Sequence, residues 1–462
     1  MSMPGFETVG DLDLQDRAAL RRVPGLGTEL RDITEVEYRQ VRLEQVVLVG
    51  VWTEGTLRDA TRSLEELARL AETAGALVLD GLVQRRDVPD PATYIGSGKV
   101  RELKEIIDAT DADTVICDGE LSPSQLRKLE DKLKVKVVDR TWLILDIFAA
   151  HARSREGKAQ VSLAQMQYLM PRLRGWGESL SRQAGGAGGG AGGGVGTRGP
   201  GETKIETDRR RIREQVSRLR REIKEMGKAR TTQRASRRRQ GVPSVAIVGY
   251  TNAGKSSLLN SLTGAGVLVE DALFATLDPT VRKARTPHGR DYTLADTVGF
   301  VRHLPHQLVD AFRSTLEEAS DADLLIHVVD ASDEEPEAQM TAVRAVLAEI
   351  DAGSIRELVV VNKADVAEPD VLARLRRREP HAVVVSARTG EGIDDLVAAI
   401  EEALPRPSIA VKVVIPYERG DLVARIHRDG DVKTSTHVDT GTAITALVPP
   451  ALAPSLTPYL VT

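Results

Sequence analysis

The chain has 462 residues, with 63 Lys or Arg against 68 Asp or Glu, so its formal net charge of −5 argues neither for nor against a nucleic-acid partner. This length predicts several domains. The single cysteine, Cys117, excludes an internal disulfide and fits a reducing cytoplasm. Residues 1–14 carry no signal pattern and no apolar run reaches transmembrane length, so we expect a cytoplasmic protein without a membrane span.

The N-terminal third predicts a small α/β domain. Residues 1–40 are polar, charged and aperiodic, which predicts a mobile extension. From residue 41 to 150, strand and helix patterns alternate, and this order predicts a parallel sheet. The expected strands are 45–52, 76–83, 114–117 and 135–138, and the expected helices are 57–71, 100–109 and 123–133. Gly96-Ser97-Gly98-Lys99 lacks the spacing of a phosphate loop, so we interpret it as a turn that starts a helix.

Two long helical segments are predicted between residues 151 and 240. Apolar residues recur at the spacing of a coiled-coil seam, which favours an antiparallel helical hairpin over packing against a globular core. The seam residues are Leu163, Met166, Met170 and Leu173 in the first segment and Ile212, Val216, Leu219, Ile223 and Met226 in the second.

The connection between these helices runs from Gly185 to Gly201, is mostly glycine, and is longer than paired helices need. It is either a flexible linker or a tip whose small side chains enter a narrow space such as an RNA cavity. The basic residues that follow have few acidic partners and predict contact with RNA phosphates, the alternative being a solvated helix face. They are Arg209, Arg210, Arg211, Arg213, Arg218, Arg220, Arg221, Lys224, Lys228, Arg230, Arg234, Arg237, Arg238 and Arg239.

A phosphate-binding loop follows the apolar run 244–248. Its sequence is Gly249-Tyr250-Thr251-Asn252-Ala253-Gly254-Lys255-Ser256, the pattern G-x-x-x-x-G-K-S between a strand and a helix. Backbone N–H groups of such a loop and the helix N-terminus favour anionic phosphate. Lys255 would reach the β- and γ-phosphates, and the Ser256 hydroxyl would ligate Mg²⁺.

Two further motifs are expected around the γ-phosphate. In Phe274-Ala275-Thr276-Leu277-Asp278, Thr276 is the candidate switch threonine that coordinates Mg²⁺ only in the triphosphate state, and Thr280 is a weaker alternative. Asp296-Thr297-Val298-Gly299 matches D-x-x-G, in which Asp296 would hold Mg²⁺ through water and the Gly299 N–H would sense the γ-phosphate. Lys255, Thr276 and Gly299 are therefore the candidate catalytic residues.

Two residues depart from the Ras pattern. Phe300 stands where Ras-like enzymes place the glutamine that orients the attacking water, and a phenyl ring cannot hydrogen-bond water. We therefore expect slow intrinsic hydrolysis that a partner stimulates. Asn252 is typical of GTPases that use a potassium ion beside the phosphates; the alternative is that it only bonds the loop backbone.

Guanine selectivity is predicted by Asn362-Lys363-Ala364-Asp365, which follows the strand-like run 358–361. A buried Asp365 carboxylate could accept from the guanine N1–H and 2-amino groups, donors that adenine lacks. Lys363 would lie over the base and Asn362 would bond to the phosphate loop. Ser386-Ala387, after the strand-like run 382–385, matches the fifth motif, whose backbone meets the guanine oxygen. The ordered set predicts a GTPase domain over residues 241–405.

Residues 406–462 predict a small α+β domain. A strand over 409–415, a helix over 418–427 and strands over 432–437 and 443–448 give βαββ order. This piece lacks the aromatic pairs with which an RNA-recognition sheet stacks bases, so docking or protein contact suits it better. The expected fold class is thus multidomain α/β: a parallel-sheet domain, an antiparallel helical hairpin, a P-loop GTPase domain and an α+β domain.

This order resembles the HflX family of ribosome-associated GTPases over roughly residues 40–448. The resemblance is carried by the phosphate loop, the two motifs at 274–278 and 296–300, Tyr94 to Lys99, Asp139-Arg140-Thr141 with Asp146-Ile147-Phe148, and the run Arg198-Gly199-Pro200-Gly201-Glu202-Thr203-Lys204-Ile205-Glu206. It departs from the family in its N-terminal segment and in the glycine-expanded tip, Gly185 to Gly194.

The resemblance implies a monomeric factor that binds the large ribosomal subunit and its RNA through the hairpin and the Gly-rich loop. With GTP and Mg²⁺, such a factor splits stalled or idle ribosomes, and the ribosome stimulates hydrolysis. Two alternatives share the nucleotide motifs: a GTPase of large-subunit assembly, and a nucleotide-regulated RNA-binding protein.

Overall fold

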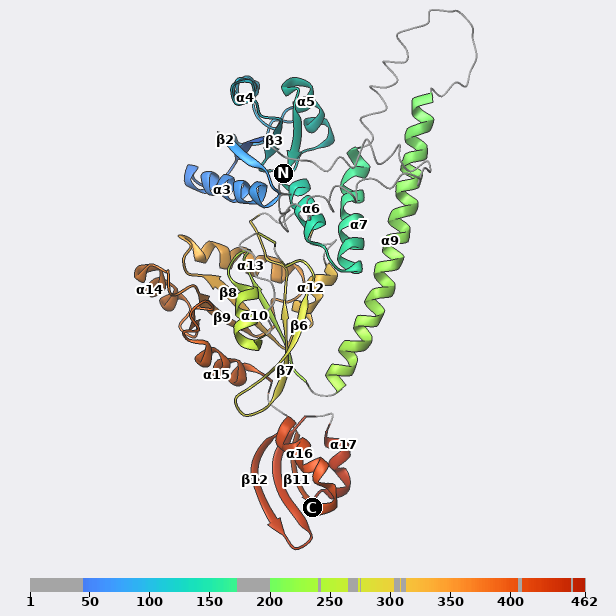
Figure 1. Cartoon of the computed structure of the whole chain (residues 1–462), viewed down its shortest axis with the longest axis vertical. Helices are drawn as coiled ribbons and strands as arrows, with labels where there is room; N and C mark the ends of the chain where they lie inside the picture. Colours follow the sequence, from blue (N-terminus) through green and yellow to red (C-terminus); the bar gives the residue numbers. More distant parts are fainter. Residues whose placement is uncertain are drawn as a thin grey trace, which may run out of the picture. The chain divides into compact units, whose positions relative to one another are not determined.

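The computed structural model of the chain describes residues 45–172, 200–239, 242–264, 273–274, 276–302, 308, 313–405, 409–449 and 452–461. The described residues contain sheets of four, six and three strands (Figure 1), which confirms the multidomain α/β class. The extension expected at 1–40, the tip Gly185 to Gly194, and Ala275 lie outside the described residues. None of the described helices is long and apolar enough to cross a bilayer.

The first sheet is parallel throughout, with strand order β2-β1-β3-β4, as the alternating pattern predicted. Its elements in chain order are β1 (Gln45–Trp52), α3 (Leu57–Thr73), β2 (Leu77–Arg85), α4 (Ser97–Thr110), β3 (Thr114–Cys117), α5 (Pro123–Leu133), β4 (Lys136–Asp139) and α6 (Arg140–His151). Gly96 is the N-cap of α4, so the Gly96 to Lys99 run does begin a helix. Cys117 is buried in the sheet, and burial raises the pKa of its thiol.

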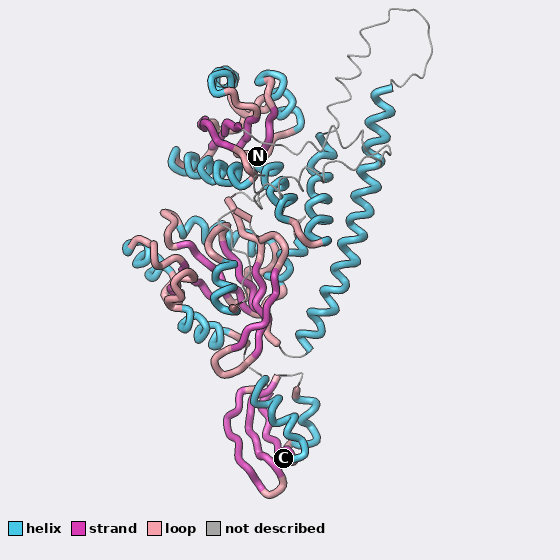
Figure 2. The backbone as a smooth tube through the Cα atoms, in the orientation of Figure 1, coloured by secondary structure: helices cyan, strands magenta, loops and turns pink. Residues whose placement is uncertain are grey.

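Helices α7 (Arg155–Arg172) and α9 (Pro200–Arg239) form the predicted pair. Their described seam residues share one apolar cluster: Ala159, Leu163, Met166 and Met170 from α7 and Ile212, Val216, Leu219, Ile223 and Met226 from α9. The two helices therefore pack side by side (Figures 1 and 2). Helix α9 begins at Pro200, inside the predicted connection, because proline fits the first turn of a helix, where its missing N–H costs nothing.

The central sheet has strand order β10-β9-β8-β5-β7-β6 and is parallel except at the β6–β7 pair. Its strands are β5 (Ser244–Gly249), β6 (Thr280–Arg285), β7 (Asp291–Asp296), β8 (Leu324–Asp330), β9 (Glu357–Asn362) and β10 (Val383–Val384). The described helices are α10 (Lys255–Thr263), α12 (Arg313–Ser320), α13 (Pro336–Glu349), α14 (Pro369–Arg378) and α15 (Ile393–Ala403). The nucleotide motifs follow the carboxyl ends of β5, β7, β9 and β10, where open parallel sheets bind ligands.

The last sheet is antiparallel, with strand order β11-β13-β12, and confirms the predicted α+β class. Its elements are β11 (Ile409–Ile415), the 3₁₀ turn η2 (Tyr417–Arg419), α16 (Gly420–Asp429), β12 (Asp431–Val438), β13 (Gly441–Val448), α17 (Ala453–Leu456) and η3 (Thr457–Tyr459). Helix α17 was not predicted. Leu452 and Leu456 nevertheless join the buried core of this domain, so the C-terminal residues complete it.

Candidate nucleotide site

The phosphate loop turns tightly between β5 and α10. At Gly254 (φ +89°) an added Cβ would lie 2.3 Å from Nδ2 of Asn362, so only glycine fits there. The loop also pairs with the D-x-x-G segment, since Thr251 N–H donates to the Phe300 carbonyl over 2.8 Å. An added Cβ at Gly299 would lie 2.7 Å from Thr251 Cγ2 and 3.0 Å from Lys255 Nζ. Gly299 therefore brings its backbone against both the loop and the lysine.

Three oxygen-bearing side chains converge at the start of α10. Ser256 Oγ donates to Asp296 Oδ2 over 2.6 Å, and the Thr276 hydroxyl lies 2.9 Å from Ser256 Oγ and 3.2 Å from the same carboxylate oxygen. Asp296 is fully buried, and among the described residues its other oxygen, Oδ1, has no hydrogen-bond partner. Hydroxyl and carboxylate oxygens are the ligands that Mg²⁺ prefers, so this set fits that ion. Thr276 belongs to this cluster, whereas Thr280 begins β6 opposite Asp296.

Burial governs the charges next to this cluster. Lys255 is buried and donates from Nζ to the Tyr250 carbonyl over 2.8 Å. Burial lowers the pKa of Lys255 to about 8 and raises the pKa of Asp296, and in both cases it outweighs their mutual attraction. An anionic phosphate beside Lys255 would supply the compensating charge that the protein alone provides only in part.

The guanine motif is tied to the phosphate loop by Asn362. Its Nδ2 donates to the Ala253 carbonyl over 2.8 Å, and its Oδ1 accepts from the Ala387 N–H over 3.0 Å. Asn362 is 2% exposed, and its two bonds join the guanine motif to the phosphate loop and to the fifth motif. This geometry matches the role that the sequence predicted for Asn362.

Asp365 differs from its expectation in one respect, because it is exposed rather than buried. The Ser386 hydroxyl donates to Asp365 Oδ1 over 2.7 Å and so orients the carboxylate. A bound base that covers Asp365 would be needed to desolvate its carboxylate. Lys363 lies beside it with Nζ 2.7 Å from Asp330 Oδ2.

Phe300 and Asn252, the two departures from the Ras pattern, differ in burial: Phe300 is buried and Asn252 is exposed. The Phe300 ring is 1% exposed and packs in a core cluster with Val248, Tyr250 and Leu316, so it points into the core rather than toward a ligand. Asn252 is exposed at φ +59°, a conformation that asparagine tolerates better than most residues. This backbone requirement is a structural reason for asparagine at that position.

A buried polar network that the sequence did not predict reaches the loop from the first domain. Arg140 pairs with Glu66 and, over 2.6 Å, with Asp118. Glu66 also accepts from the Tyr250 hydroxyl, which in turn accepts from the Arg302 N–H over 2.6 Å. Tyr250 occupies a variable position of the phosphate-loop pattern, so the motif alone gave no signal for this contact.

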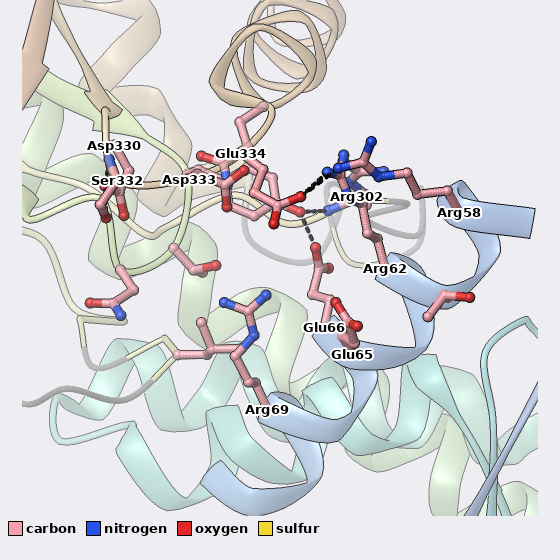
Figure 3. A pocket seen from close by; sticks show the side chains of 16 residues that line it. Arg58, Arg62, Glu65, Glu66, Arg69, Arg302, Asp330, Ser332, Asp333 and Glu334 are labelled. Atoms are coloured by element: carbon pink, nitrogen blue, oxygen red, sulfur yellow. Dashed lines mark hydrogen bonds and ion pairs between the residues drawn. The ribbon is translucent and has the colours of Figure 1, made fainter. Parts of the chain in front are cut away.

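A cavity of about 460 Å³ lies where α3 faces the phosphate loop and the segment after β8. Figure 3 shows Arg58 and Arg62 of α3 directed toward Glu334, with Arg302 beside them. Arg302 is also 3.5 Å from Glu335. Cationic and acidic groups alternate around this cavity, so it does not carry the single sign of charge expected of a phosphate site.

Comparison with known proteins gives four family-model matches along the chain. Residues 61–149 match "GTP-binding GTPase N-terminal", 151–237 match "GTP-binding GTPase Middle Region", 244–363 match "50S ribosome-binding GTPase" and 370–448 match "HflX C-terminal domain". A protein named GTPase HflX from Lacrimispora saccharolytica is 45% identical over 429 residues, which covers 93% of this chain and 98% of that protein. GTPase HflX of Escherichia coli is 44% identical over 389 residues, covering 83% and 88%.

Among solved structures, the crystal structure of SsGBP in complex with GDP is 26% identical to this chain. It covers 78% of this chain and 98% of its own, with a TM-score of 0.44. Family membership is decided by the sequence relatives, which match along nearly their whole length.

Proposed function

Because this chain belongs to the HflX family of GTPases, we propose that in its GTP-bound state it binds the large ribosomal subunit and splits stalled or idle ribosomes. GTP hydrolysis to GDP and phosphate then releases it. On this proposal residues 41–150, 151–240, 241–405 and 406–462 form the N-terminal domain, the hairpin, the GTPase domain and the C-terminal domain. The setting is the cytoplasm, and the factor acts as a monomer.

The nucleotide is held by the motifs described above. Lys255 contacts the β- and γ-phosphates, the Gly299 N–H senses the γ-phosphate, and Asp365 accepts from guanine. Ser256 and Thr276 would hold Mg²⁺, and Asp296 would contribute through water. When bound there, the ion would offset negative charge on the phosphates. The convergence of these three side chains on one point supports this assignment.

The proposal includes a potassium ion beside the phosphates, which is typical of GTPases with asparagine at this loop position, and Asn252 is exposed. A cation there would offset negative charge on the phosphates, which the apolar Phe300 side chain cannot do. We expect GTP turnover to be faster in potassium than in sodium buffers of equal ionic strength, and Asn252→Ala to lose that difference. Equal turnover in the two buffers would leave Asn252 with its backbone role alone.

The observation that most supports ribosomal RNA as the partner is the exposed basic face of α9. This helix has 40 residues and so a length of about 60 Å. Its described seam residues are buried or half-buried against α7, whereas most of the described basic side chains on its other faces are exposed. The exposed set is Arg210, Arg211, Arg213, Arg218, Arg220, Arg221, Lys224 and Lys228. A long helix with exposed basic side chains suits phosphate contacts over a large RNA surface.

Hydrolysis is proposed to depend on that partner. Phe300 is packed in the core, so the D-x-x-G segment offers no side chain at its position to orient water. The large subunit would complete the site, and we expect its addition to raise GTP turnover at least about tenfold, a barrier change of about 1.4 kcal/mol. Turnover unchanged by large subunits would contradict the proposal.

Sucrose-gradient sedimentation separates this function from its alternatives. With GTP or a non-hydrolysable analogue, a splitting factor converts intact ribosomes into subunits. An assembly GTPase would leave intact ribosomes untouched and sediment with precursors. Deleting residues 185–194 should abolish splitting while GTP binding is kept. A protein that only binds RNA would bind RNA equally well with and without that segment.

A further inference from the structure

The segment that carries Thr276 is anchored on both sides by residues outside the central sheet. On the N-terminal side, the buried Phe274 ring packs edge-on against Phe148 of α6, with ring centroids 4.7 Å apart at 80°. Phe274 adopts φ +60°, which is costly for an aromatic residue, so packing must hold it there. Leu277 is also buried. Thr276 therefore lies between two anchors, one on each side of it in the chain.

The anchor on the C-terminal side is Asp278, which holds Ser154, the residue that caps α7. Its carboxylate accepts from the Arg153 N–H over 2.9 Å, the Ser154 N–H over 2.7 Å and the Ser154 hydroxyl over 2.5 Å. Ser154 Oγ in turn accepts from the Gly157 N–H over 2.8 Å. A helix N-terminus has unpaired N–H groups, and Ser154 accepts from one of them while the Asp278 carboxylate holds Ser154 in place. Here that carboxylate comes from 124 positions away in the chain.

The first turn of α7 is shaped to admit this carboxylate. Gly157 lies inside the helix, where glycine is otherwise unfavourable. An added Cβ at Gly157 would lie 2.4 Å from Asp278 Oδ1 and 3.2 Å from Ser154 Oγ. Both distances are too short for ordinary contact, and the first would fall on a carboxylate held by three hydrogen bonds. The close approach of the two segments therefore needs glycine at this position.

We propose that Asp278 is a positioning residue that couples Thr276 to the root of the α7–α9 hairpin. Thr276 and Asp278 are two residues apart, so a threonine fixed on magnesium also fixes the carboxylate on α7. The coupling must act in both directions: an intact cap favours the triphosphate state, and the triphosphate strengthens the cap. The inference rests on the proposed role of Thr276 at the magnesium ion, but it does not depend on the ribosome.

The first test is nucleotide affinity of the full chain, measured with fluorescent GDP and a fluorescent non-hydrolysable GTP analogue. In Mg²⁺ we expect Asp278→Ala to weaken the triphosphate about tenfold, as the loss of charge-assisted hydrogen bonds implies. GDP affinity should not change, and in EDTA the two nucleotides should be affected alike. Ser122→Ala is the matched control, because it removes the side-chain cap of α5, a helix of the N-terminal sheet domain.

The reciprocal variant acts from the helix. Gly157→Ala should raise the helix propensity of α7, so a loss of triphosphate affinity cannot be assigned to a weakened helix. We expect it to reproduce the effect of Asp278→Ala, and the double variant to be no worse than either single one. Additive effects, or normal triphosphate affinity in Gly157→Ala, would overturn the coupling.

Hydrogen exchange gives a readout at the helix itself. In the wild type the amides of Arg153, Ser154 and Gly157 should exchange more slowly with the GTP analogue than with GDP, and in Asp278→Ala that difference should vanish. A difference that persists in the variant contradicts the inference. Thr276→Ala tests the proposed magnesium site separately from the coupling. If Thr276→Ala leaves Mg²⁺-dependent triphosphate binding intact, the proposed site is wrong. If Thr276→Ala weakens that binding and Asp278→Ala leaves it intact, the coupling alone is wrong.

Discussion

Replacing Asp365 by Asn is expected to weaken binding of GTP and GDP by two to three orders of magnitude. A guanine base offers two donors to the carboxylate, and the amide of asparagine would turn one acceptor into a donor that faces them. Charge-assisted hydrogen bonds contribute about 1.5–3 kcal/mol each, and a donor facing a donor adds a desolvation cost. The Ser386 hydroxyl already fixes one carboxylate oxygen, so the side chain cannot easily rotate away from the mismatch.

Titration with fluorescent guanine and xanthine nucleotides measures this effect and its cause. Xanthine carries a carbonyl where guanine has its amino group, so Asp365→Asn should bind xanthosine nucleotides better than the wild type does. Asp370→Asn is the matched control, because Asp370 is an exposed carboxylate in the first turn of α14. If the Asp365 variant bound GTP normally, guanine would have to be recognised elsewhere.

The nucleotide motifs were predictable because each is a short pattern at a strand end, where backbone geometry limits which residues fit. Gly254 and Gly299 illustrate this, since any side chain there would collide with Asn362 or Thr251. The seam of the helical pair was predictable for a similar reason: a repeat of apolar residues is visible within one segment. Both signals are local in the sequence.

The contacts that join the domains gave no such signal. Glu66 and the Tyr250 hydroxyl are 184 positions apart, and a tyrosine at a variable position of a loop motif suggests no partner. The contact of Asp278 with Ser154, the capping residue of α7, is likewise invisible locally, because the two residues are 124 positions apart. Asp365 was expected to be buried, but in the absence of a base its carboxylate is exposed. The chemistry was thus readable from the sequence, whereas the connections between domains required the structure.

Arg140→Ala is expected to destabilise the N-terminal domain by about 3–5 kcal/mol, the usual cost of leaving a buried charge without its partner. The Arg140 side chain is 2% exposed, and its partners Glu66 and Asp118 are 8% and 9% exposed. Removing the guanidinium would leave two carboxylates in a site that water reaches poorly. Chemical denaturation followed by circular dichroism measures the loss.

Two companion variants separate charge burial from lost packing. Arg58→Ala removes another arginine that is paired with a carboxylate, but Arg58 and Glu334 are 70% and 72% exposed, so we expect a change below about 1 kcal/mol. Adding Glu66→Gln to Arg140→Ala removes one of the stranded charges while its side-chain oxygen can still accept from Tyr250. The double variant should therefore regain part of the lost stability. If the double variant were less stable than Arg140→Ala alone, the arginine would stabilise the domain through its packing volume. Charge pairing between Arg140 and Glu66 would then not be what links α3 to the phosphate loop.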